Sequence, residues 1–234
     1  MGNISYTQIG DGETILLLHG WGQNKEMMLP LIDTLKHKYK CVLLDLPGFG
    51  KSSFNNKVTL DDYCENIHQF LKENNILPKH IVGHSFGGKL AINYFLKYGC
   101  VSTLTIIASP ILKPKRTLKY YYKIYKYKLK KKLHLKVNNH GSKDYIDCPL
   151  NMKKFFINVV NTSFDKYLDK VNIPTLLIWG ASDDKVPLKK AKQLNNKIKN
   201  SELKILEGSH FAYLENIEFT RLIIQSFLRR HAND

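Results

Sequence analysis

The chain has 234 residues, 43% of them hydrophobic, which is enough to bury a sizeable core in one domain with or without an insertion. It contains no apolar run near the roughly 18–20 residues that a membrane-spanning helix needs, and its first residues lack the features of a secretion signal. The four cysteines are far apart and form no Cys-x-x-Cys pair, which favours free thiols over metal ligands or disulfides. We therefore expect a cytoplasmic protein.

The formal net charge of +16 is concentrated in one segment of the chain. Residues 112–136 hold 11 of the 36 lysines and arginines and no acidic residue. Lysine is abundant and arginine scarce throughout, a composition that suits an A+T-rich coding sequence. Such a composition accounts for an excess of lysine, but not for its concentration in one segment.

Short apolar runs alternate with helix-like segments in the first part of the chain. Continuous apolar runs are expected of strands that are covered on both faces, and apolar residues at helical spacing indicate helices. Strands are predicted at Ile4–Gln8, Thr14–Leu18, Cys41–Leu44, His80–Val82 and Val101–Ala108. Helices are predicted at Lys25–His37, where Pro30 limits regularity, at Leu60–Asn74 and at Lys89–Lys97.

The same alternation returns in the last part of the chain. Strands are predicted at Pro174–Trp179 and Leu203–Leu206, and helices at Leu188–Lys199 and Asn216–Arg230. Strands that alternate with helices through short loops predict a parallel sheet with helices on both faces. The closing helix is expected to direct a group of apolar side chains towards the core, namely Ile217, Leu222, Ile223, Phe227 and Leu228.

A Gly-x-Ser-x-Gly pattern lies between the predicted strand at His80–Val82 and the predicted helix at Lys89–Lys97. It is typical of a nucleophile elbow, a strand-to-helix turn so sharp that the flanking side chains must be absent. Gly83 and Gly87 meet this steric demand, and Ser85 is left with its hydroxyl projecting at the top of the sheet. The pattern is weak alone, so its meaning depends on the rest of the chain.

Further blocks of residues strengthen that interpretation, because they occur in one order along the chain. They are His19-Gly20-x-Gly22, Asp45-x-Pro47-Gly48-x-Gly50-x-Ser52, Gly83-x-Ser85-x-Gly87-Gly88, Gly180-x-x-Asp183 with Val186-Pro187, and Gly208-x-His210. With these blocks the chain resembles the α/β-hydrolase fold superfamily, in the subgroup of small capped hydrolases and carboxylesterases. The resemblance implies a mostly parallel sheet of about seven strands, a core formed by residues 1–110 and 171–234, and a helical cap at 111–170 inserted after the sixth family strand.

A catalytic triad follows from the chemistry and from the family order. A serine hydroxyl is a poor nucleophile until a base takes its proton, and the base needs an acid to orient it. In this fold the order is serine, acid, histidine, each after the end of a strand. Ser85, Asp183 and His210 meet both conditions. Asp184 is the alternative acid, but the family pattern places the acid three residues after the glycine and selects Asp183.

The resemblance also implies donors for the oxyanion of a tetrahedral intermediate. One is the backbone N–H of Phe86, which follows the nucleophile, and the other is that of Trp21 in the loop after the early strand. His19 and Gly20 are expected to support that loop, and His84 beside the nucleophile is expected to pack rather than react. Trp21 and Phe86 would also line an acyl pocket.

The Lys/Tyr-rich insertion contains one amphipathic pattern. Leu118, Tyr122, Tyr125, Leu129 and Leu133 recur at spacings of 4, 3, 4 and 4, which predicts a helix with an apolar face. We expect a lid helix with its apolar side on the active site and a solvated lysine face. The alternative is that the lysines attract an anionic membrane or an acidic substrate. Nucleic acid is not expected, since no recognised motif accompanies them.

Other chemistries lack their motifs. A phosphate-binding loop ending at Gly50-Lys51-Ser52 would need glycine where Asp45 stands, and there is no dinucleotide fingerprint or His-Glu-x-x-His. We infer no nucleotide cofactor and no catalytic metal. Serine at position 85, where dehalogenases and epoxide hydrolases of this fold carry aspartate, disfavours halides and epoxides.

The predicted activity is hydrolysis of carboxylic esters through an acyl-enzyme, on a small-molecule acyl ester. Thioester cleavage and hydrolysis of a carbon–carbon bond in a diketone are alternatives on the same triad. A ligand-binding receptor with little turnover is the alternative of another class.

Overall fold

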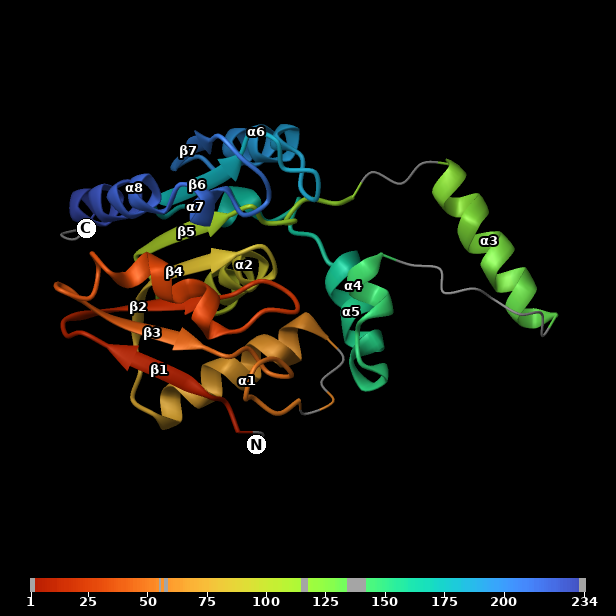
Figure 1. Cartoon of the computed structure of the whole chain (residues 1–234), viewed down its shortest axis with the longest axis horizontal. Helices are drawn as coiled ribbons and strands as arrows, with labels where there is room; N and C mark the ends of the chain where they lie inside the picture. The colour runs from red at the N-terminus through yellow and green to blue at the C-terminus, as the bar shows by residue number, and fades with distance from the viewer. Residues whose placement is uncertain (1–2, 55, 57–58, 115–117, 134–141, 232–234) are drawn as a thin grey trace.

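A seven-stranded sheet forms the centre of the protein. The computed structural model describes residues 3–54, 56, 59–114, 118–133 and 142–231. The strands are β1 (Tyr6–Ile9), β2 (Glu13–Leu18), β3 (Tyr39–Leu44), β4 (Pro78–His84), β5 (Thr103–Ile107), β6 (Thr175–Gly180) and β7 (Ser201–Leu206). Their order is β1-β3-β2-β4-β5-β6-β7 (Figure 1). Only β1 pairs antiparallel, with β3, so the predicted mostly parallel sheet of about seven strands is confirmed.

Helices pack around this sheet and fill the connection between β5 and β6 (Figure 1). α1 packs on α2, and α8 packs on η1. The helices of the core are η1 (Lys25–Ile32), α1 (Leu60–Glu73), α2 (Phe86–Tyr98), α6 (Leu188–Lys197), α7 (Ala212–Glu215) and α8 (Ile217–Arg230). The β5–β6 connection contains α3 (Leu118–Lys132), α4 (Lys143–Ile146), η2 (Leu150–Met152), α5 (Lys153–Asn161) and η3 (Leu168–Lys170).

The central strands are buried along almost their whole length and are mostly apolar, because helices cover them. Leu16 of β2, Ile106 of β5 and Leu177 of β6 are each fully buried. Parallel strands that are covered on both faces have no solvent side, so they show a continuous apolar run rather than an alternation. The edge strand β1 does alternate between half-buried and exposed side chains, as expected where one face meets water.

Two predicted helices differ from the structure. The helix expected at Lys25–His37 is only the 3-10 helix η1, which contains Pro30. Proline lacks the N–H that an α-helix needs at an interior position. In α8, Leu222 was expected in the core but is 58% exposed, while Thr220 and Ile224 are fully buried. Phe227 and Leu228 are buried and Ile217 and Ile223 are half-buried against the core, so of the five predicted residues Leu222 alone departs from the expected stripe.

The apolar face predicted for the insertion does not cover the active site. Figure 1 shows α3 standing apart from the body of the molecule, whereas α4 and α5 lie against it. The five residues of that face are exposed, from 43% for Leu129 to 88% for Leu118. The expected lid role of this helix is thus wrong, because spacing identifies an apolar face but not what the face contacts. The division into a core and a cap at 111–170 stays a prediction.

α5 is held to the core by buried polar contacts. The Nζ of Lys89, in α2, donates to the carbonyl oxygens of Val159 (2.8 Å) and Thr162 (2.9 Å) at the C-terminal end of α5. The Oδ1 of Asn158 accepts from the N–H of Leu60 at the start of α1 (2.9 Å). Burial lowers the pKa of Lys89 to about 8. A buried cation at the C-terminal end of a helix also complements the helix dipole.

Lys89→Met should loosen α5, since it leaves two carbonyl groups without their donor. We expect a loss of about 1–3 kcal/mol in the free energy of unfolding and faster hydrogen exchange of the α5 amides. Lys97→Met, on the same helix, removes the more exposed ion pair with Glu65 and should cost at most about 1 kcal/mol. Equal effects of the two substitutions, or unchanged exchange in α5, would show that Lys89 does not hold this helix.

Candidate active site

Ser85 lies in a tight turn between β4 and α2. Its φ of 50° and ψ of −109° lie outside the conformations common for a residue with a side chain. A Cβ at Gly83 would lie 2.4 Å from the carbonyl carbon of Gly87, and one at Gly87 would lie 2.2 Å from the backbone oxygen of Leu18. Only glycine fits at both positions, which is the steric demand expected of a nucleophile elbow.

His210 and Asp183 meet at the same edge of the sheet as this turn. His210 follows β7 and Asp183 follows β6, and the Nδ1–H of His210 donates to Oδ2 of Asp183 at 2.9 Å. The other carboxylate oxygen, Oδ1, accepts from the N–H groups of Lys185 (2.9 Å) and Val186 (2.8 Å). Both side chains of the pair are buried. With Nδ1 carrying the proton, Nε2 is left as an acceptor for a hydroxyl proton.

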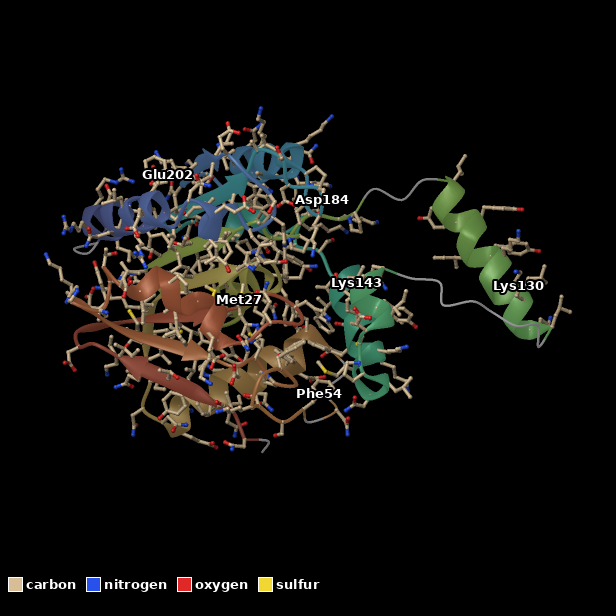
Figure 2. All side chains as sticks on the ribbon, in the orientation of Figure 1. Met27, Phe54, Lys130, Lys143, Asp184 and Glu202 are labelled. Carbon is tan, nitrogen blue, oxygen red and sulfur yellow. The ribbon has the colours of Figure 1, made fainter. Side chains whose placement is uncertain are left out.

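Asp184 differs from its neighbour Asp183 in burial. Asp184, which is labelled in Figure 2, is exposed, whereas Asp183 is 5% exposed and accepts a hydrogen bond from His210. The geometry therefore supports Asp183 as the acid partner of His210. The catalytic role itself stays a prediction.

His84 joins the serine turn to the histidine loop. Its Nε2–H donates to the backbone oxygen of His210 (3.2 Å), and the two imidazole rings are 4.9 Å apart. Burial, and secondarily the nearby His210, lowers the pKa of His84 to about 3. His84 is therefore neutral at neutral pH and brings no charge to the site. It packs as expected, and it also fixes the position of the loop that carries His210.

The loop after β2 carries the first predicted oxyanion donor. Gln23 donates its N–H to the carbonyl of Gly20 (3.3 Å) and accepts from the Gly20 N–H through Oε1 (2.9 Å), which forms a turn with Trp21 inside. The indole of Trp21 lies edge-on to the ring of Phe86, with centroids 5.4 Å apart. Phe86 opens α2, where an N–H has no carbonyl one turn earlier to bond. The Phe86 N–H directly follows Ser85 in the turn, and the catalytic role of the Trp21 and Phe86 N–H groups stays a prediction.

His19 braces that loop against the one after β3. Its Nδ1–H donates to the carbonyl of Gly20 (2.7 Å), and its Nε2 accepts from the N–H of Leu46 (3.0 Å). The ring is fully buried, and burial lowers its pKa to about 4. A neutral imidazole with one donor and one acceptor satisfies both contacts at once.

Asp45 stabilises the loop after β3 by accepting hydrogen bonds at its carboxylate. The sequence motif alone did not indicate this role. Its carboxylate accepts from Nζ (2.8 Å) and the N–H (2.9 Å) of Lys25, and from the N–H of Lys51 (3.1 Å). Burial alone would raise the pKa of Asp45, but these donors hold it below its ordinary value. The Lys25–Asp45 pair therefore fixes the loop on which His19 rests.

An aromatic cluster lies next to the serine turn, and part of it comes from α5. Phe156 is edge-on to Trp21 at 4.8 Å, and Phe155 stacks on Tyr63 at 4.5 Å and contacts Phe86 at 6.0 Å. Sequence reasoning missed both phenylalanines of α5, although a Phe-Phe pair inside a lysine-rich insertion is a usable signal. Within the cluster Phe86 and Phe155 are buried, and Trp21 and Phe156 are half-buried.

The described side chains include no group of three or more histidine, cysteine, aspartate or glutamate residues placed to hold a metal ion. The cysteines are free thiols, and Cys41, Cys64 and Cys148 are buried while Cys100 is exposed. At this sheet edge the His210 imidazole contacts the Asp183 carboxylate, and the turn that carries Ser85 lies at the same edge.

The buried His84 should make the fold sensitive to acid. Between pH 6.5 and about 3 the unfolded chain binds a proton at this residue and the folded chain does not, so stability falls as pH falls. On going from pH 7 to pH 5, the free energy of unfolding measured in urea should therefore fall by roughly 2 kcal/mol less in His84→Gln than in the parent. The exposed His37, changed to Gln, is the matched control and should keep the parent's acid dependence. An unchanged acid dependence in His84→Gln would contradict this assignment.

Known proteins resemble this chain in sequence and in fold. A family model described as alpha/beta hydrolase fold matches residues 13–158 and 113–217. The chain is 26% identical over 264 residues to monoacylglycerol lipase ABHD6 of Bos taurus, across 96% of this chain and 78% of the lipase. It is 23% identical over 247 residues to the pimeloyl-(acyl-carrier protein) methyl ester esterase of Legionella pneumophila (strain Lens), across 97% and 100% of the two chains.

A solved structure shows the same fold. The esterase EaEST from Exiguobacterium antarcticum superposes with a TM-score of 0.78 at 21% identity, across 97% of this chain and 96% of the esterase. The family model spans most of the chain, from the second strand to the start of the last helix. The chain therefore belongs to the alpha/beta hydrolase fold family.

Proposed function

We propose that the protein is a serine hydrolase that cleaves carboxylic esters through an acyl-enzyme. The observation that carries the proposal is the buried 2.9 Å hydrogen bond between His210 and Asp183, at the sheet edge where the strained turn presents Ser85. Relatives named as a lipase and as an esterase support an ester as the substrate.

In the first half of the reaction, Nε2 of His210 takes the proton of Ser85 while Oγ attacks the ester carbonyl carbon. The carbonyl π electrons move to oxygen, and the N–H groups of Trp21 and Phe86 would hold that oxyanion. The intermediate then collapses, the bond to the alcohol oxygen breaks, and the protonated His210 gives its proton to the leaving alcohol. The acyl group remains on Oγ of Ser85.

In the second half, a water molecule replaces the alcohol. His210 takes a proton from the water molecule as the water oxygen attacks the acyl carbon. When the bond between the acyl carbon and Oγ of Ser85 breaks, His210 gives that proton to Oγ. Asp183 keeps the proton of His210 on Nδ1 and stabilises the imidazolium in both halves. The carboxylate is fixed for this task by the N–H groups of Lys185 and Val186.

The surroundings of Ser85 favour an apolar acyl group. Trp21 and Phe86 contact the phenylalanines of α5, so an acyl chain that extends from Oγ of Ser85 would meet aromatic side chains. A small-molecule acyl ester is the proposed substrate, with thioester and diketone cleavage as alternatives on the same residues. The cytoplasmic location also stays a proposal.

Asp183→Asn should lower kcat for p-nitrophenyl acyl esters by roughly 10⁴, because an amide no longer holds the required tautomer of His210. Asp184→Asn, the adjacent and exposed control, should keep kcat near the parent value, and Ser85→Ala gives the baseline without a nucleophile. An acyl-chain series with matched thioesters and a diketone, measured on the parent, identifies the preferred bond. Loss of activity in Asp184→Asn with retention in Asp183→Asn would contradict the proposed triad.

A further inference from the structure

α3 presents apolar side chains on one face to open solvent. Leu118, Tyr122, Tyr125, Leu129 and Leu133 fall on that face, here called the α3 face, and are 88%, 65%, 65%, 43% and 59% exposed. Figure 2 shows Lys130 on α3, which stands apart from the body of the protein. Exposed apolar groups gathered on one helix mark an interaction surface more often than scattered ones do.

Lysines flank this face. Lys126 is four residues after Tyr122 and three before Leu129, so it borders the α3 face, and Lys132 borders the other side as the residue three after Leu129. Lys126 and Lys132 are exposed, and Lys130 is half-buried. Residues 112–136 carry 11 lysines and arginines and no acid, so the helix lies in a strongly positive field.

We propose that α3 is a docking helix for an anionic membrane surface. Leucine side chains would enter the boundary between headgroups and acyl chains, tyrosine rings would lie at the headgroup level, and lysines would reach the lipid phosphates and carboxylates. The proposal concerns binding and not turnover, so it does not depend on the proposed hydrolysis.

The dimensions of α3 suit a helix that lies in the plane of the interface. A helix of this length extends about 22 Å, shorter than the hydrocarbon core of a bilayer. Within the described ranges, no helix is both long enough and apolar enough to cross a membrane. A basic helix with apolar residues on one face and lysines at its borders fits an interfacial position instead.

The combination of charge and apolar surface selects this partner over others. A nucleic acid would neutralise the lysines but leave the leucines in water. A second copy of this chain would bring a second cluster of like charge against the first. An anionic bilayer covers both kinds of side chain at once.

Vesicle sedimentation tests the proposal on the full chain. Vesicles of phosphatidylcholine alone and of phosphatidylcholine mixed with phosphatidylserine are compared at low and high salt, with the parent and with Ser85→Ala. We expect binding to the phosphatidylserine vesicles, weakened by salt, and equal in both proteins because docking needs no nucleophile.

Two sets of variants separate the α3 face from the general charge of the protein. The charge variant replaces three lysines of α3 with glutamate, and the apolar variant replaces three leucines of the α3 face with serine. Each lysine near an anionic surface strengthens binding about fivefold, so the charge variant should bind phosphatidylserine vesicles at least about 100-fold more weakly than the parent. The apolar variant should bind more than about tenfold more weakly. The charge variant is Lys126→Glu, Lys130→Glu, Lys132→Glu, with the exposed control Lys189→Glu, Lys192→Glu, Lys199→Glu. The apolar variant is Leu118→Ser, Leu129→Ser, Leu133→Ser, with the exposed control Leu77→Ser, Leu150→Ser, Leu222→Ser.

Circular dichroism and thermal unfolding of each variant establish that it is folded before binding is compared. Absence of phosphatidylserine-dependent binding by the parent overturns the proposal, as does an equal loss in variants and controls. Binding of α3 to single-stranded RNA in place of vesicles, or a dimer that the α3 substitutions abolish, assigns the face to another occupant and also overturns it.

Discussion

The structure depends on one close approach between backbone segments. Gly87 stands so near the end of β2 that a methyl group would overlap the carbonyl oxygen of Leu18, and Gly83 stands equally near Gly87. This contact brings the end of β2, the end of β4 and the start of α2 together at one point. The loop after β2 carries Trp21 and the start of α2 carries Phe86, so the rings of Trp21 and Phe86 meet, with centroids 5.4 Å apart.

Burial gives three imidazoles near this point different roles. His19 and His84 are fully buried, with pKa values lowered to about 4 and about 3, so both are neutral and connect neighbouring loops through hydrogen bonds. Of the three, His210 is the one that donates to a carboxylate, that of Asp183. A charge can therefore develop on His210 opposite a fixed anion, while the neighbouring rings add no repulsion.

Much of the fold and the residues of the site were predictable, because local patterns determine them. Buried parallel strands are continuous apolar runs, and the turns at their ends carry glycine, serine, aspartate and histidine at fixed spacings. The contacts of the insertion were not predictable in this way. The spacing of Leu118 and Leu129 shows that α3 has an apolar face, yet it cannot show that this face meets solvent while α5 packs against Phe86, the residue after Ser85. Lys89 looks like a surface lysine in sequence, and only its long-range bonds to α5 explain its burial.

The central claim is that Ser85 is an activated nucleophile. Labelling with a fluorophosphonate probe, followed by mass spectrometry of the labelled peptide, tests it most directly because the probe reacts with serines that a base activates. We expect one adduct on Ser85, abolished in Ser85→Ala and slowed in Asp183→Asn. No labelling of the folded parent, or labelling that persists in Ser85→Ala, would contradict it.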